Sequence, residues 1–126
     1  MFSTVILSSL STFTREFERC CREYSKLHIA TASCGDPGRG DGLPFTHLQN
    51  FDGKIVATVG TTFAQTHPDG IKFLSALTTN LRIFKNNNLV FHPKVYLFSS
   101  AARAAVFVGS SNLTFSGFYK NAEVNV

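Results

Sequence analysis

A histidine and a lysine in the last third of the chain have a spacing that lets both act on one group. His92 and Lys94 flank Pro93 within a β-rich run, Leu89 to Phe98. Because residues two apart in a strand point to the same face, we expect the two side chains to lie together. A lysine at neutral pH is a cation without a lone pair, so the pair is a poor metal site and a good anion site. Phosphate suits it, since lysine neutralises the oxygens and a neutral imidazole attacks phosphorus or protonates a leaving oxygen.

A second set of polar residues follows the next β-rich run. The loop 109–112 supplies a glycine, two hydroxyls, the Asn112 amide and several backbone N–H groups, which together can cradle an oxyanion. Ser110 and Asn112, with Lys94, are therefore the candidate phosphate-binding residues. Glu123 is a carboxylate of the kind that fixes a histidine tautomer and stabilises an imidazolium. Either motif alone is more often an ordinary strand end or turn, and the two together are far more specific.

The order and spacing of these residues resembles the phospholipase D superfamily, whose pattern is His-x-Lys, four residues, Asp, six residues, Gly-Ser-x-Asn. The matching residues are His92-Pro93-Lys94, Gly109-Ser110-Ser111-Asn112-Leu113-Thr114, Gly117 and Asn121-Ala122-Glu123. The residues of these motifs are most similar to those of the nuclease branch, which includes metal-independent restriction endonucleases and helicase-associated nuclease domains. The resemblance implies an α/β fold, a phospholipase D-like mixed β-sheet flanked by helices.

The resemblance also implies a two-step cleavage of a phosphodiester without a metal or other cofactor. His92 attacks phosphorus to form a phosphohistidine, and His92 of a second copy protonates the leaving oxygen and then activates water. Lys94, Asn112 and Ser110 hold the non-bridging oxygens, and Glu123 orients a histidine. Since the chain has one such motif, the implied active site needs two chains, and a two-fold homodimer brings the same residue from both together.

Two features depart from the family pattern. The family's aspartate position falls on Ser99, and nine residues rather than six separate it from Gly109, which predicts a lengthened hairpin around Arg103. That aspartate is regarded in the family as structural, and restriction-endonuclease members often lack it. The chain stops at Val126, where the resemblance predicts further sheet and helix. We treat residues 1–126 as a single phospholipase D-like nuclease domain, either complete or the N-terminal part of a longer protein.

Composition sets broader bounds on the function. Of the 126 residues, 44% are hydrophobic and 16% charged, which excludes a disordered tail and favours a packed globule. No apolar run is long enough to span a membrane, and the first residues do not read as a secretory signal, so a cytoplasmic location is expected. The three cysteines show no metal-binding spacing. A net charge of +4 fits an anionic partner such as nucleic acid.

The elements that must position these residues can be read from periodicity. Apolar residues from Phe13 to Leu27 recur at helical spacing, and Pro68 suits the first turn of another helix. β-rich runs alternate with these segments, which argues for a mixed sheet with helices. The expected strands are 5–7, 28–32, 55–59, 81–84, 89–98, 104–109 and 122–126, and the expected helices are 13–27, 43–51 and 66–77.

Three functions stay open at this point. The first is a nuclease, with DNA as the expected substrate and with further domains or subunits of a restriction or helicase system as possible partners. The second is a hydrolase of phospholipid or of other small phosphodiesters, for which the sequence offers no membrane-seeking helix. The third is a non-catalytic module that binds phosphate or DNA without turnover.

Overall fold

The computed structural model describes residues 3–7, 9–42, 44–62, 65–121 and 123–126 of the chain. Helices and strands alternate along most of it, as the sequence predicts. The elements are α1 (Leu10–Glu23), β1 (Lys26–Thr31), a 3₁₀ turn (Gly40–Gly42), α2 (Phe45–Gln49), β2 (Lys54–Gly60), α3 (Pro68–Leu77), β3 (Leu81–Phe84), β4 (Lys94–Ser100), β5 (Arg103–Val108) and α4 (Phe115–Tyr119).

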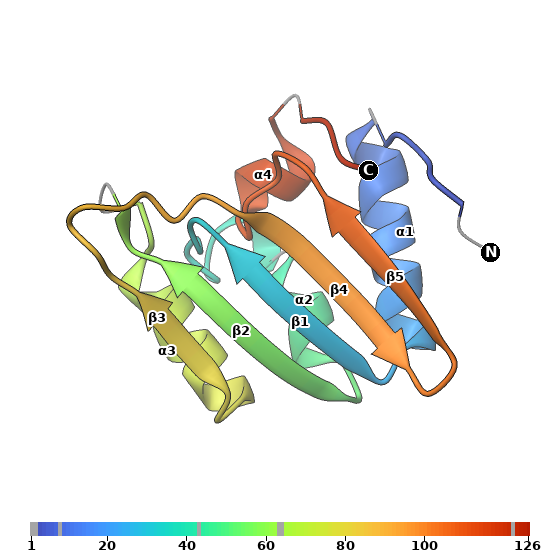
Figure 1. Ribbon diagram of the computed structural model, residues 1–126, viewed down its shortest axis with the longest axis horizontal. Helices are drawn as coiled ribbons and strands as arrows, with labels where there is room; N and C mark the ends of the chain where they lie inside the picture. Colours follow the sequence, from blue (N-terminus) through green and yellow to red (C-terminus); the bar gives the residue numbers. More distant parts are fainter. Residues whose placement is uncertain (1–2, 8, 43, 63–64, 122) are drawn as a thin grey trace.

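The strands form one mixed sheet, which confirms the predicted fold class. Its order is β3-β2-β1-β4-β5, with β1, β2 and β3 parallel and with β4 antiparallel to both β1 and β5. The chain therefore builds outward from β1 to one side, then crosses to the other side of β1 to add β4 (Figure 1). Helices α2 and α3 make the connections between the parallel strands.

The core lies between the sheet and the helices, which sit on one face of it (Figure 1). Alternate residues of β1 and β4 point into this core, as the strict alternation of buried and half-buried positions shows. Helix α1 contributes Phe13 and Phe17, both fully buried. The ring of Phe17 packs edge-on against Phe98 and Phe118, with centroids 5.2 and 4.9 Å apart. Such pairs add a directional preference to the burial of apolar area.

The opposite face of the sheet carries no helix among the described residues (Figure 1). Its side chains include Val95 and Leu97 of β4, which are half-buried, and Val106 and Val108 of β5, which are 52% and 48% exposed. An exposed apolar surface of this kind is typical of a protein–protein contact.

The outermost strand predictions at the two ends of the chain are wrong. Residues 3–6 have no regular structure, and Leu7 makes one isolated bridge to Asn125, which makes a second bridge to Gly109. Ala122 lies outside the described residues, and Glu123 is not in a strand. Both segments have β-type composition, but their pairing is limited to the isolated bridges of Asn125 with Leu7 and Gly109 and a few backbone hydrogen bonds, so neither forms a strand.

The helix predictions are correct in kind and differ at their ends. Helix α1 begins at Leu10 and ends at Glu23, because Leu27 is needed on the buried face of β1. Pro68 opens α3 as predicted, and the side chain of His67 caps it by accepting the Asp69 N–H. The predicted helix 43–51 is α2, although Leu43 lies outside the described residues. None of the described helices has the length and apolarity to cross a lipid bilayer.

Candidate active site

The candidate residues lie at the end of β1, between a parallel neighbour and an antiparallel one. β1 has β2 on one side and β4 on the other, so the carboxyl end of β1 meets the amino end of β4. Thr31, the last residue of β1, pairs with Lys94, the first of β4. In open α/β sheets, ligands bind outside the carboxyl ends of strands at such a switch point. The fold thus brings the His-x-Lys motif to the place where a ligand site is expected.

His92 lies just before β4 rather than within a strand, which corrects the predicted strand 89–98. Pro93 has no N–H to donate to the ladder, although its carbonyl accepts the Ala32 N–H at 2.8 Å. The predicted closeness of the two functional side chains is nevertheless present. Lys94 Nζ lies 2.8 Å from Nδ1 and 2.9 Å from Nε2 of His92, and it donates to the His92 carbonyl at 3.2 Å.

The two side chains differ in exposure. The lysine is only 8% exposed, whereas His92 faces solvent. Burial lowers the pKa of Lys94, and the carboxylate of Glu123 opposes that shift. No carboxylate oxygen of the described residues lies within 4.0 Å of Nζ. A buried ammonium without a close counter-ion is costly for the fold and attractive to an anion.

Asn112 is held at the same end of the sheet by its amide oxygen. Oδ1 accepts the Ser33 N–H at 3.2 Å and lies 3.4 Å from the Thr31 hydroxyl. With the oxygen turned to the protein, the Nδ2 group has no hydrogen bond to the described part of the chain and is available as a donor. The residue is therefore fixed by the end of β1 in an orientation that can serve a phosphate oxygen.

Thr31 joins β1 to the loop that carries Asn112. Its hydroxyl is fully buried, accepts the Leu113 N–H at 3.1 Å and donates to the Ser33 carbonyl at 2.8 Å. The sequence reasoning did not single out this threonine, because its importance depends on which residues stand beside it in space.

Replacing Thr31 by valine is expected to destabilise the fold by about 1–3 kcal/mol, because the Leu113 N–H would be left buried without an acceptor. It should also loosen Asn112, because the Oδ1 of that residue loses one of its two contacts. Urea denaturation measures the first effect. Thr58→Val is a matched control, since Thr58 is half-buried in β2 and its hydroxyl makes no hydrogen bond to the described residues. Equal stability of the two variants would contradict the assigned role.

Ser110 is occupied elsewhere in this arrangement. Its hydroxyl accepts the Val124 N–H at 2.9 Å and donates to the Val124 carbonyl at 3.3 Å. The side chain thus ties the loop to the end of the chain. The neighbouring Ser111 is fully buried, and its hydroxyl accepts from Nδ2 of Asn125 at 2.9 Å. Two serines of the motif therefore hold the loop in place.

Tyr96 supports the same loop from the sheet. Its hydroxyl donates to the Ser111 carbonyl at 2.8 Å, and burial raises the pKa of Tyr96 well above its ordinary value. The phenol therefore stays protonated and acts as a hydrogen-bond donor. This contact could not be read from the sequence, because Tyr96 and Ser111 lie 15 residues apart and meet only in the folded chain.

Glu123 makes no hydrogen bond or ion pair with His92 in the described part of the chain. It is half-buried and accepts from Nδ2 of Asn121 at 3.3 Å. Its charge acts on Lys94, as the pKa of that lysine shows. An electrostatic influence on the lysine is thus present, while the expected role of orienting a histidine stays a prediction.

The position of the family's aspartate is remote from these residues. Ser99 stands near the other end of β4, where it pairs with Lys26 at the start of β1. The predicted hairpin is present, with Ala101 and Ala102 between β4 and β5. A carboxylate at position 99 would lie a whole strand away from Lys94, so its replacement by serine leaves the site intact.

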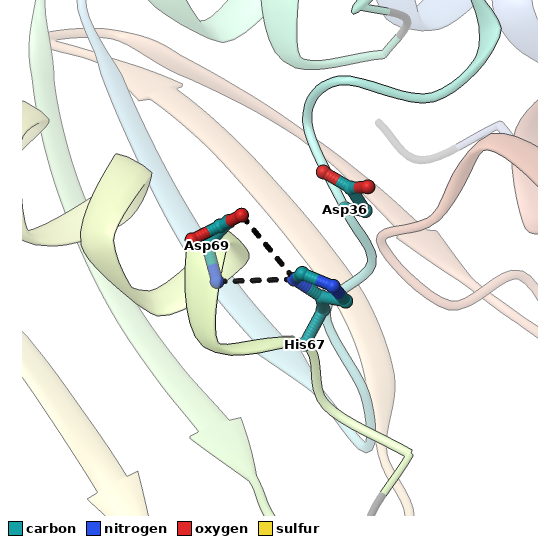
Figure 2. Close-up of side chains that lie close together, drawn as sticks. All are labelled: Asp36, His67 and Asp69. Carbon is teal, nitrogen blue, oxygen red and sulfur yellow. Dashed lines mark hydrogen bonds and ion pairs between the residues drawn. The ribbon is translucent and has the colours of Figure 1, made fainter.

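One group outside this site has the donor types of a cation site. Figure 2 shows Asp36, His67 and Asp69, whose ligand atoms lie within 4.8 Å of one another. Each takes part in local hydrogen bonds: His67 Nδ1 accepts the Asp69 N–H at 3.1 Å, and Asp36 accepts the Gly38 N–H at 2.9 Å. Lys72 also lies 3.7 Å from Asp69. The cluster is largely exposed, and its hydrogen bonds stabilise the loop after β1 and the start of α3.

Comparisons with known proteins concern the fold. Searches against family models and against curated proteins each find no match. Among solved structures, NucT from Helicobacter pylori has a TM-score of 0.59 and 13% identity over 99% of this chain and 84% of that one. Nuc from Salmonella typhimurium, a phospholipase D family member, has a TM-score of 0.61 and 16% identity over 89% and 72%. A polyphosphate kinase from Porphyromonas gingivalis has a TM-score of 0.58 and 15% identity over 99% and 19%.

Proposed function

We propose that this chain, which has the fold of the phospholipase D superfamily, is a metal-independent phosphodiesterase that cleaves nucleic acid. The observation that carries the proposal is the contact between a buried ammonium and an exposed imidazole, Lys94 and His92, at the switch point of the sheet. The resemblance of the His-x-Lys and Gly-Ser-Ser-Asn motifs to the nuclease branch supports this choice of reaction.

The proposed reaction has two displacements at phosphorus. A nitrogen of His92 bonds to phosphorus as the bond to the leaving oxygen breaks, and that oxygen takes a proton from His92 of a second copy. Water then attacks phosphorus and gives its proton to the second histidine, and the nitrogen–phosphorus bond breaks. Each histidine begins and ends in its original state, so no cofactor is consumed.

The remaining residues act on the charge of the phosphate. Lys94 and the Nδ2 group of Asn112 donate to the non-bridging oxygens, whose charge grows during the attack. Ser110 would join them only by releasing the Val124 backbone, so we assign it first to the shape of the loop. The charge of Glu123 raises the pKa of Lys94, and in the proposed reaction its carboxylate also orients a histidine.

Two copies of the chain complete the proposed site, because one chain supplies one His-x-Lys motif. An isologous interface places the same residue of both copies beside the two-fold axis. The apolar side chains on the uncovered face of the sheet, including Val106 and Val108, support association with another protein surface. We also propose further domains or subunits of a restriction or helicase system as additional partners.

DNA is the proposed substrate. A net charge of +4 favours a polyanion. Phospholipid stays the less favoured alternative, because the residues of the two motifs are most similar to those of the nuclease branch.

Mixing two kinds of chain tests both the activity and the shared site. The parent and His92→Ala chains are unfolded together in equal amounts, refolded, and assayed for cleavage of plasmid DNA in excess EDTA. If each site needs two intact histidines, random pairing leaves about a quarter of the specific activity of the parent refolded alone. If each chain held a complete site, about half would remain, as expected for simple dilution.

The controls separate the possible outcomes. Chains of the parent and of Gln49→Ala, refolded in the same ratio, should keep the full activity, since Gln49 is an exposed residue of α2 and does not lie on the uncovered face of the sheet. Half of the activity in the His92→Ala mixture contradicts the shared site. DNA binding by the folded parent without any cleavage contradicts the phosphodiesterase and identifies a non-catalytic binding module.

A further inference from the structure

A buried asparagine, Asn125, contacts the loop that contains the Gly-Ser-Ser-Asn motif. Its side chain and backbone are only 2% exposed, and both ends of the side-chain amide are hydrogen-bonded. Nδ2 donates to the Ser111 hydroxyl at 2.9 Å, and Oδ1 accepts the Ser111 N–H at 3.4 Å. Because a buried amide without partners is costly, these two bonds fix how the two residues face each other.

The backbone around Asn125 is held from two sides. On one side, the Ser110 N–H donates to the Val124 carbonyl at 3.0 Å. On the other side, Leu7 and Asn125 exchange two backbone hydrogen bonds, at 2.7 and 3.3 Å. The segment 124–126 therefore lies between residue 7 and the motif loop, and it presents the Asn125 side chain to the loop in one position.

The first glycine of the motif makes room for this contact. A Cβ atom on Gly109 would lie 2.3 Å from the Val124 carbonyl oxygen and 2.5 Å from Oδ1 of Asn125. Both distances are far shorter than van der Waals contact, so a side chain at position 109 would push the segment 124–126 away from the loop. The space that the glycine leaves free is thus filled by Asn125 and its neighbour.

Ser111 connects Asn125 to the candidate active site. It is fully buried, its hydroxyl and N–H are bonded to Asn125, and its carbonyl accepts from the Tyr96 hydroxyl at 2.8 Å. The next residue is Asn112, whose Oδ1 accepts the Ser33 N–H and whose Nδ2 we assign to a phosphate oxygen. Because Ser111 and Asn112 share a planar peptide bond, a displacement of Ser111 also moves the backbone that carries the Asn112 amide.

We propose that Asn125 is a positioning residue for the phosphate-binding amide of Asn112. This inference rests on the proposed function, because the place of Asn112 affects the rate only if its amide donates to a reacting phosphate. Asn125 acts through Ser111 and does not touch the substrate. A donor that is already in place needs no reorganisation when charge develops on the phosphate oxygens. Loss of Asn125 therefore slows the chemical step more than it weakens the binding of DNA, for which Lys94 remains.

Steady-state kinetics test the assignment, with a fluorophore-labelled DNA duplex in excess EDTA as the substrate. Asn125→Leu removes both side-chain bonds to Ser111 at a similar volume, so kcat should fall about 10- to 100-fold, the effect of a misplaced group in an active site. KM should change much less, because the lost interaction belongs to the transition state. Asn125→Asp should recover most of the activity, since a carboxylate accepts the Ser111 N–H and the Ser111 hydroxyl can rotate to donate to it.

Thr78→Val separates positioning from a general loss of stability. The Thr78 hydroxyl donates to the Ile55 carbonyl, near the end of β2 that is opposite to the candidate site. This variant should lower the urea midpoint and keep the kcat of the parent. If Asn125→Leu does not fold, Ser111→Ala removes only the bond to Nδ2 and should show a smaller loss of kcat in a folded protein.

A second readout needs no cleavage and keeps this inference separate from the proposed function. The ¹⁵N heteronuclear NOE of the Asn112 side-chain amide should fall in the folded Asn125→Leu or Ser111→Ala protein and stay at the parental value in Thr78→Val. Parental kcat in the folded variants overturns the inference, and so does an Asn112 amide that stays as ordered as in the parent. A parent that does not cleave DNA contradicts the proposed function alone, and the order of the Asn112 amide then decides whether Asn125 holds it.

Discussion

Replacement of His92 by alanine is expected to abolish cleavage of DNA in excess EDTA, with a loss of about 10⁴-fold or more. The loss is large because the same residue serves twice, as the nucleophile in one copy and as the acid in the other. The variant should also fail to form a covalent phosphoenzyme. Rapid acid-free quenching with ³²P-labelled DNA, followed by denaturing electrophoresis, measures both the cleavage and the trapped intermediate.

The His92→Ala protein should fold as the parent does, because His92 is exposed and lies outside the ladder of β4. Its urea midpoint is therefore part of the measurement. Gln49→Ala is the control, since it removes an exposed polar side chain of α2 that lies outside the candidate site and off the uncovered face of the sheet. Residual cleavage above about 1% of the parent, in a folded protein free of other nucleases, would contradict a histidine nucleophile. Activity that EDTA removes from the parent would contradict the metal-independent mechanism.

The regular elements were predictable where local pattern and tertiary position agree. The β-branched run 55–59 is β2 within one residue at each end, and 81–84 is β3 itself. β2 lies inside the parallel part of the sheet, where a mostly apolar run is needed, and β3 pairs with it at the edge. The end segments, 5–7 and 122–126, have similar residues, but pairing is a property of two segments. Asn125 bridges both Leu7 and Gly109, and nothing in either local sequence announces a partner.

Helix α4 was not predicted, because its local sequence signal is weak although the helix forms. Its residues, Phe115–Tyr119, form one short turn that includes Gly117, which is a poor local signal for a helix. Two contacts outside the reach of periodicity stabilise it. Thr114 caps it by accepting the Gly117 N–H at 2.8 Å, and Phe118 is buried against Phe17 of α1. The glycine of the motif is thus part of a helix that packs on the core.

Some residues of the candidate site could be predicted from the sequence, and others depend on the tertiary fold. His92, Lys94 and Asn112 could be named because their chemistry and spacing are written in the sequence. The residues that hold them, Thr31 and Ser33, could not, because the pairing of Thr31 with Lys94 depends on the register of two strands far apart in the chain. The spacing of residues in the sequence therefore predicts the candidate site residues, and the register of β1 and β4 determines which residues position them.

The cost of burying Lys94 leads to the second large expected effect. Replacement of Lys94 by methionine keeps an unbranched stem and removes the charge. We expect catalytic activity to fall about 10²–10³-fold, the usual effect of removing one donor to a developing oxyanion. We also expect the free energy of unfolding at neutral pH to rise by about 1–2 kcal/mol, because a buried charge without a close counter-ion is replaced by an apolar group.

The pH dependence gives this expectation a sign that can be checked. Burial lowers the pKa of Lys94 from its ordinary 10.5, so the unfolded chain binds more protons than the folded one in the interval between the two pKa values. The stability of the parent therefore gains from this group as the pH rises through that interval, and the advantage of the methionine variant should shrink there. Urea denaturation of both proteins at neutral and alkaline pH measures the difference.

Lys54→Met is the control for the loss of a lysine as such, since Lys54 is exposed at the start of β2 and its replacement should change stability by less than about 0.5 kcal/mol. A Lys94→Met protein that is both inactive and less stable than the parent would contradict the assignment, because Lys94 would then contribute to the fold rather than cost it. A variant that is more stable and inactive would show that the site is maintained against the stability of the protein. In that case the ammonium is retained because phosphate, when bound, supplies the counter-ion that the folded chain lacks near Nζ.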